Sequence, residues 1–189
     1  MSFDTQKYEG GLCGLQNFGA TCYLNSVLQT LFNNNYLVQY ILNNKYTLNG
    51  DFEEQILLKE LEELLEIVWG QNCIIAPKKF VMEFSQIEKM NLNEQNDPDE
   101  YYEKIITRLY EETCIEIKET NNKQWDLNFK NKHSYINSEF YGQYKSEIQC
   151  LKCNHSSLSY NPYISLKLEL VDSSMINCLK SHLSWENNI

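Results

Sequence analysis

The chain has 189 residues and a formal net charge of −10 at pH 7, with 16 Lys and Arg against 26 Asp and Glu. This length suffices for one domain with a buried core, and the negative charge argues against nucleic acid as a partner, because nucleic-acid-binding domains usually carry a basic surface. Seven cysteines, without a secretory signal or a long apolar run, indicate a reducing setting. We therefore expect an intracellular protein, cytoplasmic or nuclear or both, with no membrane partner.

The segment from Gly14 to Leu31 predicts a cysteine placed at the start of a helix. Apolar residues recur with the spacing of one buried helical face, at Leu24, Val27, Leu28 and Leu31. Cys22 then lies beside the helix N-terminus, where backbone N–H groups and the helix dipole favour negative charge and hence a nucleophilic thiolate. The Asn17 amide is suited to donate to an oxyanion that forms near the sulfur, and Gly19 lets a substrate chain approach closely. Taken alone, Cys22 would equally suit a buried structural role.

The whole segment matches, position by position, the cysteine motif of the ubiquitin-specific proteases, Gly-Leu-x-Asn-x-Gly-x-Thr-Cys-Tyr-x-Asn-Ser-x-Leu-Gln-x-Leu. The chain thus resembles the N-terminal half of the catalytic domain of that family. The resemblance implies an α+β, papain-like cysteine protease fold, here incomplete, with a helical thumb and the start of a β fingers region. It implies a tail at 1–11, a thumb-like part at 12–137 and the start of fingers and palm at 138–189. The apolar character of the cysteine helix is similar to that of the herpesvirus-associated branch.

Two further helices are predicted before residue 90. Apolar residues on one face predict a helix from Glu53 to Trp69, and Gly70 is typical of the position that ends it. Ala76-Pro77 predicts the start of a short helix that runs to Phe84. Asparagine runs are typical of polar loops, and they occur at 33–35, 121–122 and 187–188.

A third long helix is predicted to start near Asp97 and to run to about Glu119. Asp97 fits the N-cap, Pro98 the first helical position and Glu100 the third, an Asp version of the capping box. These roles explain the acidic residues without any further function. The ubiquitin-specific proteases, however, carry Gln-x-Asp-Ala-x-Glu-Phe here, and their Gln and Asp hold the ubiquitin tail. The resemblance therefore implies that Gln95 and Asp97 also bind substrate.

The last third of the chain is predicted to be extended. The polar segment 121–137 predicts a loop with at most one short strand. From Phe140 to Cys150 the pattern alternates with period two, and a second alternating run covers Ile164 to Leu170. We therefore expect two strands that form a hairpin joined through residues 150–155.

Two cysteines in the hairpin joint, Cys150 and Cys153, have the spacing of a zinc knuckle. A structural zinc needs four ligands, and the chain holds one such Cys-x-x-Cys pair. The resemblance implies that this pair is half of a zinc site in the fingers, completed only if a second Cys pair is supplied, with His155 disfavoured as a ligand. No cofactor is expected for catalysis.

A cysteine hydrolase also needs a general base, normally a histidine. The chain has three histidines, His133, His155 and His182, and none stands in the Gly-His-Tyr setting that the ubiquitin-specific proteases use. The catalytic roles implied by the resemblance therefore end with Cys22 as the nucleophile and Asn17 as the oxyanion donor.

These observations predict a thiol-dependent deubiquitinase that hydrolyses the (iso)peptide bond at the C-terminal glycine of ubiquitin through a cysteine thioester. Its partners would be ubiquitin or ubiquitinated proteins, and the acidic chain suits the arginine-bearing ubiquitin tail, although acidic surfaces equally serve solubility. The alternative is a catalytically incomplete fragment or pseudo-enzyme that acts at most as a ubiquitin-binding module. A zinc-binding adaptor built on Cys150 and Cys153 would leave the cysteine motif unexplained.

Overall fold

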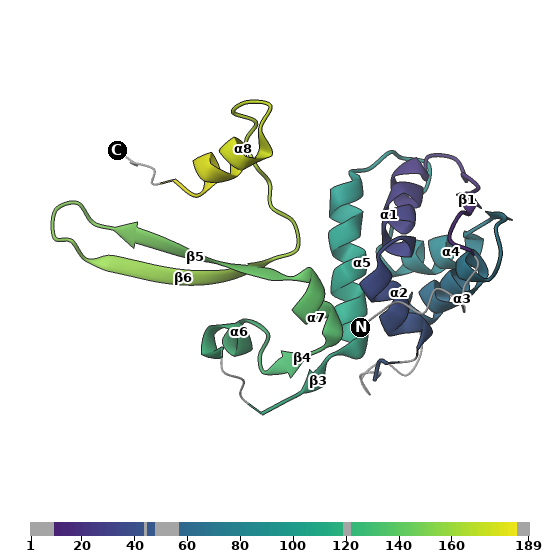
Figure 1. The fold of residues 1–189 in the computed structure, drawn as a ribbon, viewed down its shortest axis with the longest axis horizontal. Coiled ribbons are helices and arrows are strands. Elements are labelled where there is room, and N and C mark those ends of the chain that lie inside the picture. Colours follow the sequence, from purple (N-terminus) through teal and green to yellow (C-terminus); the bar gives the residue numbers. More distant parts are fainter. Residues whose placement is uncertain (1–9, 44, 48–56, 119–121, 185–189) are drawn as a thin grey trace.

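The computed structural model describes residues 10–43, 45–47, 57–118 and 122–184, and within them it confirms the predicted α+β organisation. The helices are α1 (Cys22–Phe32), α2 (Asn35–Leu42), α3 (Leu57–Gly70), α4 (Lys78–Ile87), α5 (Pro98–Thr113), α6 (Lys123–Asn128), α7 (Tyr135–Phe140) and α8 (Met175–His182). The strands are β1 (Gly14–Leu15), β2 (Ile74–Ile75), β3 (Ile115–Glu116), β4 (Lys132–His133), β5 (Gly142–Gln149) and β6 (Ser156–Tyr163). Figure 1 shows a helical body from which the β5–β6 hairpin extends.

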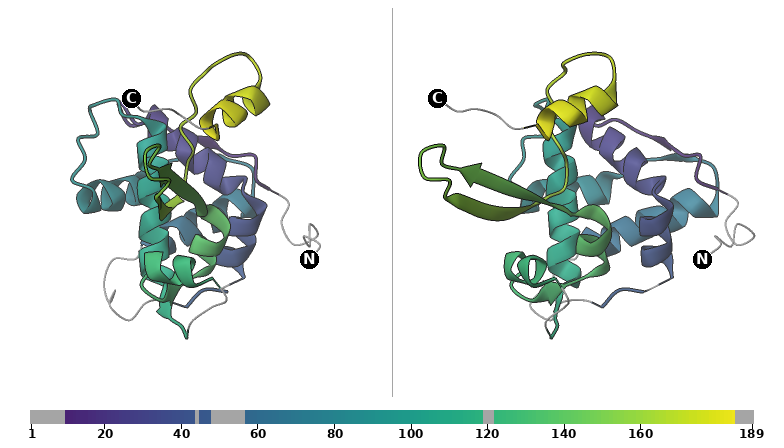
Figure 2. Two further views of the ribbon diagram at one scale, coloured as in Figure 1. Left: turned by 90° about the vertical axis from the view of Figure 1, so that its left-hand side faces the viewer. Right: turned by 60° about the vertical axis from the view of Figure 1, so that its left-hand side comes forward.

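Helix α5 is the central element of the helical body, and it packs against α1, α3 and α7 (Figures 1 and 2). The core between these helices is aliphatic and aromatic, and its fully buried side chains include Leu24, Leu28, Phe32, Leu37, Ile41, Leu58, Leu61, Leu65, Phe80, Phe84, Ile105 and Ile106. Burial of these apolar faces provides the main stabilisation of the body. None of the described helices is both long and apolar enough to cross a membrane.

One carboxylate lies fully buried in this body. Glu112 of α5 accepts hydrogen bonds from the backbone N–H groups of Leu57 and Leu58 at the described start of α3, both at 2.9 Å, and from Arg108 Nε at 2.7 Å. Burial raises the pKa of Glu112, and the three donors oppose that rise. The side chain therefore ties the N-terminal end of α3 to α5, where a negative charge also complements the helix dipole.

The first helices agree with the sequence predictions. Helix α1 carries its predicted apolar stripe inward, and α3 covers the described part of the helix predicted from Glu53, whose first four residues lie outside the described residues. Helix α4 follows Pro77, as predicted, and continues to Ile87. Asp97 caps α5 as predicted, by accepting from the N–H of Asp99 at 2.9 Å. The predicted capping box was wrong, because the Glu100 carboxylate pairs with Lys104 at 2.7 Å instead of turning back to the N-cap.

Three further predictions between residues 33 and 137 were wrong. Helix α5 ends at Thr113 rather than near Glu119, because the chain turns extended at Cys114 and then pairs as β3 with β4. The polar segment 121–137 is not a loop: it forms α6, β4 and α7, and Ser134 supplies a capping box with Asn137. The asparagine runs are not mere loop residues, since Asn34 caps α2 and Asn122 caps α6.

The hairpin is present, but its second strand differs from the prediction. Strand β5 matches the first predicted strand apart from its ends, and it pairs antiparallel with β6, residues 156–163, rather than with Ile164–Leu170. The tight joint explains the difference, because the Cys150 N–H donates to His155 O at 2.8 Å and strand pairing resumes at once. Both faces of β6 are largely exposed, so its residues carry no apolar alternation.

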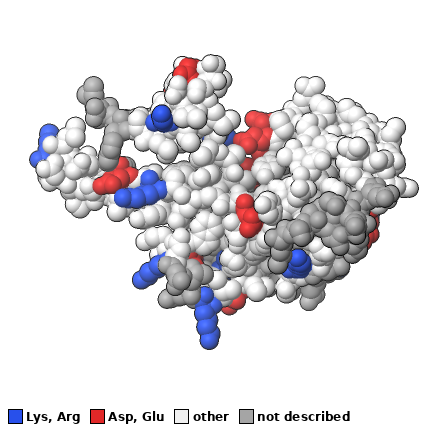
Figure 3. Space-filling model, in the orientation of Figure 1, with Lys and Arg blue, Asp and Glu red and all other residues white. Residues whose placement is uncertain are grey.

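The segment after β6 returns to α5 instead of forming a strand. Ser165 Oγ donates to Glu103 at 2.7 Å and to Asp99 at 3.2 Å, and Lys167 pairs with Asp99 at 3.6 Å. In the space-filling view, acidic side chains lie where the helical body faces the hairpin and the segment after it (Figure 3). These contacts anchor residues 165–167 to the first turns of α5.

Candidate active site

Cys22 is the first residue of α1, and its side chain is exposed to solvent. The residues on either side of it, Thr21 and Tyr23, are buried and fix the helix start in the body. Asn25 N–H makes the first turn's hydrogen bond to Thr21 O at 3.0 Å. The N–H groups that precede it in the helix have no acceptor within the helix, and no side chain caps them.

The Asn17 side chain is oriented by a hydrogen bond to the helix. Thr21 Oγ1 donates to Asn17 Oδ1 at 2.7 Å and accepts from the Phe18 N–H at 3.0 Å. Because the amide oxygen faces Thr21, the Nδ2 group is the part of the exposed Asn17 side chain left to donate elsewhere. The arrangement suits an oxyanion donor near Cys22.

Two further polar residues of α1 hold the segment that precedes the cysteine. Asn25 Nδ2 donates to Gln16 O at 3.3 Å, and Gln29 Nε2 donates to Cys13 O at 2.7 Å. With Thr21 they lie at i, i+4 and i+8, on one face of the helix. Sequence analysis assigned these residues no role, although their polar spacing beside the apolar stripe was a readable signal.

The predicted substrate-binding residues lie near this site. Asn96, which stands between Gln95 and Asp97, donates from Nδ2 to the Tyr23 hydroxyl at 3.3 Å. The Tyr23 ring lies 4.9 Å from the Tyr101 ring of α5, centroid to centroid. The start of α5 is thereby joined to the start of α1, and the structure brings exposed Gln95 and Asp97 to the same end of the body as the cysteine.

A shallow hollow runs beside α1, one turn beyond the cysteine. It has a volume of about 270 Å³. Residues from α1 and α5 line it, namely Ser26, Val27, Thr30, Pro98, Asp99 and Tyr102. Ser26 Oγ donates to Cys22 O at 3.0 Å, so this hollow adjoins the helical turn that bears the candidate nucleophile.

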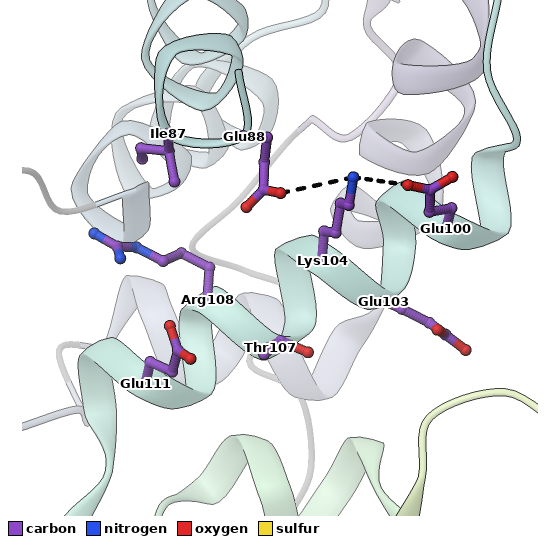
Figure 4. Close-up of a pocket in the computed structure, with 8 residues that line it drawn as sticks. All are labelled: Ile87, Glu88, Glu100, Glu103, Lys104, Thr107, Arg108 and Glu111. Atoms are coloured by element: carbon purple, nitrogen blue, oxygen red, sulfur yellow. Dashed lines mark ion pairs between the residues drawn. The ribbon is translucent and has the colours of Figure 1, made fainter. Parts of the chain in front are cut away.

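A larger hollow of about 410 Å³ lies elsewhere, between the end of α4 and the exposed side of α5 (Figure 4). Lys104 points between Glu88 and Glu100 there and pairs with both, at 3.7 and 2.7 Å. Its lining contains no cysteine or histidine. Its lining has four carboxylates and two cations, and we assign it no chemistry.

The three histidines are separated among different elements. His133 lies in β4, where its Nε2 is 3.2 Å from Ser138 Oγ, and β4 lies at the opposite end of α5 from the start of α1 (Figure 1). His155 follows the turn of the extended hairpin, and His182 is the last residue of α8 and exposed. No described contact joins any of them to Cys22.

Cys150 and Cys153 lie exposed in the hairpin turn. Hydrogen bonds from the backbone N–H groups of Cys153 and Lys152 lower the pKa of the Cys150 thiol, and a hydrogen bond with the Cys153 side chain lowers it further. This donor set suits a soft metal ion such as zinc. Among the described residues, however, no third Cys, His, Asp or Glu completes a metal-binding group. The two thiols therefore fit only half of a zinc site.

Comparison with known proteins shows that most of the sequence, and not only the cysteine motif, matches one family. The profile of the family described as ubiquitin carboxyl-terminal hydrolase matches residues 13–183, which is most of the chain. The chain belongs to this family. Within the ubiquitin carboxyl-terminal hydrolases it is of the ubiquitin-specific protease type, which confirms the predicted resemblance.

Several curated relatives are identical to this chain at about a quarter of the aligned residues. The chain is 27% identical over 179 residues to ubiquitin carboxyl-terminal hydrolase Usp2 of Drosophila melanogaster, with 87% of this chain and 19% of that protein covered. It is 28% identical over 182 residues to ubiquitin carboxyl-terminal hydrolase 15 of Homo sapiens, covering 85% and 19%. The chain therefore spans about a fifth of the length of these relatives. They do not test the predicted herpesvirus-associated branch, which stays a prediction.

The fold of this chain also matches a solved structure. One chain in the structure of the SAGA Ubp8/Sgf11/Sus1/Sgf73 DUB module aligns with a TM-score of 0.66 and 20% identity, covering 99% of this chain and 43% of the other. The incomplete papain-like α+β fold predicted from the sequence is thus confirmed.

Proposed function

We propose that this chain is the thumb and the beginning of the fingers of a thiol-dependent deubiquitinase, with Cys22 as its nucleophile. One observation carries the proposal: an exposed cysteine begins α1 while Thr21 turns the neighbouring Asn17 amide so that its N–H groups are free to donate. The names of the relatives, which are ubiquitin carboxyl-terminal hydrolases, support ubiquitin as the substrate. The partners would be ubiquitin or ubiquitinated proteins.

The proposed reaction proceeds in two steps. The Cys22 thiolate attacks the carbonyl carbon of the C-terminal glycine of ubiquitin, and Asn17 Nδ2 and N–H groups of the first helical turn bind the oxyanion. The tetrahedral intermediate collapses, the substrate amine leaves with a proton, and a thioester remains on Cys22. Water then hydrolyses the thioester and frees the thiol. The base that moves these protons is proposed to be a residue other than the three histidines of this chain.

The approach of the ubiquitin tail is proposed to follow the start of α5. Exposed Gln95 and Asp97 flank the site, and the hollow between α1 and α5 adjoins the turn of Cys22. The acidic Asp97 suits the arginine-bearing tail of ubiquitin. Gly19 has φ of +80°, a conformation that favours glycine, and it leaves the backbone before Cys22 open to a passing chain.

The direct test is covalent capture by ubiquitin that carries an electrophile at its C-terminus. The full-length protein is incubated with this probe, and the adduct is located by mass spectrometry of its peptides. The proposal expects one adduct, on the peptide that contains Cys22. An adduct on a different cysteine would contradict the role of Cys22. Binding of the probe with no covalent adduct would contradict it as well.

Asp97 allows its two roles to be separated by substitution. Asp97→Asn keeps an N-cap, because Asn caps as well as Asp, and it removes the charge. We expect KM for a ubiquitin substrate to rise about 10-fold, the loss of a hydrogen bond to a charged group, with unfolding free energy changed by less than about 0.5 kcal/mol. Glu94→Gln, an exposed acid of the same loop, serves as the control. An unchanged KM for Asp97→Asn would leave Asp97 with the capping role alone.

Asn17 is expected to affect the chemical step rather than substrate binding. Asn17→Ala should lower kcat by about 10²–10³-fold with little change in KM, the usual effect of losing one oxyanion donor. Asn17→Asp keeps an acceptor for the Thr21 hydroxyl but loses both donor hydrogens, so it should be at least as impaired. Steady-state kinetics on the full-length protein measure both variants. Near-normal kcat for Asn17→Asp would show that the residue serves only to hold Thr21.

A second candidate function is favoured by the separation of the histidines from Cys22. Without a base the chain would act at most as a ubiquitin-binding module. Calorimetric titration with ubiquitin, beside the capture experiment, separates the two proposals: binding without capture or turnover supports the module, and turnover excludes it. The zinc site remains a proposal that depends on two further ligands.

A further inference from the structure

A second pair of cysteines, Cys13 and Cys73, lies where β1 pairs with β2. Cys13 directly precedes β1, and Cys73 directly precedes β2. These strands are paired in parallel, with Gly14 opposite Ile74, so the two cysteines occupy neighbouring positions of adjacent strands. Their sulfur atoms are 3.8 Å apart although the residues are 60 positions apart in sequence.

Backbone contacts on both sides hold the two thiols at this separation. The Gly14 N–H donates to Cys73 O at 3.1 Å, and Cys13 Sγ donates to Gln71 O at 3.2 Å and to Val68 O at 3.6 Å. Cys13 is only 6% exposed, whereas Cys73 is half-buried and more accessible. A small rotation of either side chain would bring the sulfur atoms to bonding distance, since neighbouring strand positions fall in the range that disulfides bridge.

We propose that Cys13 and Cys73 form an oxidation site that a peroxide converts into an intramolecular disulfide. The accessible Cys73 thiolate attacks hydrogen peroxide, one oxygen is transferred to the sulfur, and hydroxide leaves and becomes water on protonation. The Cys13 thiol then attacks the sulfenic acid, the S–S bond forms, and a second water leaves. In total, two thiols and one hydrogen peroxide give one disulfide and two waters. The thiols are oxidised and the peroxide is reduced.

The site would act on the segment that leads to the candidate nucleophile. Cys13 lies at the beginning of the stretch that α1 holds through Gln29 and Asn25. A disulfide would fix that stretch to β2 and close a loop that spans 60 positions. Desolvation and the hydrogen bond with Cys13 raise the pKa of the Cys73 thiol, so its oxidation is expected to be slower than that of a fully exposed thiol.

The test uses the native full-length protein, exposed to millimolar hydrogen peroxide. Remaining thiols are blocked in denaturant, and the protein is digested with trypsin without reduction. We expect residues 8–45 to be linked to residues 60–78, within one molecule, and the link to disappear on reduction. Residues 8–45 contain both Cys13 and Cys22, so a second cleavage, after Phe18, separates the two cysteines. It shows which of them carries the bond without the use of a variant. Absence of the linked peptides, or a bond that involves Cys22, would overturn the proposal.

Variants and a stability measurement complete the design. Cys22→Ser should keep the link and Cys13→Ser should lose it; a link that persists in Cys13→Ser would refute the assignment. The oxidised wild type should melt about 5–10 °C higher than the reduced protein, because closing a long loop restricts the unfolded chain. Cys73→Ser should show no such shift. None of these readouts requires hydrolase activity, so their outcome does not depend on whether the proposed function is correct.

Discussion

Replacing Cys22 with serine is expected to abolish release of ubiquitin by the full-length protein, with a loss on the order of 10⁴-fold or more in kcat. The exposed sulfur is the only atom of the site proposed to form a covalent bond with substrate. A serine hydroxyl at the same helix start lacks the nucleophilicity of a thiolate at neutral pH. Hydrolysis of a ubiquitin–dye conjugate measures the loss, and ubiquitin binding by the variant should persist.

Cys178→Ser is the matched control for this substitution. Cys178 is buried in α8, and its Sγ donates to Asp172 O at 3.7 Å, a bond that a serine hydroxyl can also make. This variant should retain activity within a few-fold of the wild type. Undiminished turnover by Cys22→Ser would remove the cysteine from the mechanism and with it the deubiquitinase assignment.

Replacing Glu112 with alanine is expected to lower the free energy of unfolding by about 3–5 kcal/mol, the usual cost of removing one partner of a buried ion pair. The substitution removes the Glu112 carboxylate, which contacts Arg108 and accepts from the N–H groups of Leu57 and Leu58. The polar connection between α3 and α5 is then lost, while their apolar packing remains. Urea denaturation of the wild type and the variant measures the difference.

Glu100→Ala provides the comparison on the same helix. Glu100 and Lys104 have the same i, i+4 spacing as Arg108 and Glu112, but the Glu100 side chain is 57% exposed, whereas that of Glu112 is fully buried. An exposed pair of this kind contributes less than about 1 kcal/mol. Equal effects of the two substitutions would show that burial does not set the importance of Glu112.

The helices that carry the site were predicted because their apolar spacing and caps are local signals. The stripe of α1 and the Asp97 cap of α5 are both as expected, whereas the exact helix ends and the pairing of Glu100 with Lys104 were not predicted. Local signals failed where tertiary pairing competes with them. Helix α5 stops at Thr113 because the β-branched Ile115 that follows pairs with His133 in another strand, a partner that propensity along the chain does not reveal.

In the hairpin, a local pattern predicted a strand where none forms. Apolar alternation at Ile164–Leu170 predicted a strand, yet the polar residues 156–163 pair with β5 because a short turn fixes the register. Alternation reports which faces are buried, and it carries no information where both faces of a strand meet solvent.

The family, the candidate nucleophile and the helix that presents it follow from the amino-acid sequence, because these depend on residue identity within one continuous motif. The distant groups that surround the motif are set by the packing of the folded chain. It joins Asn96 to Tyr23 and places Cys73 against Cys13. These contacts join residues 60 or more positions apart, and they arise from packing of the whole body, which no local pattern encodes.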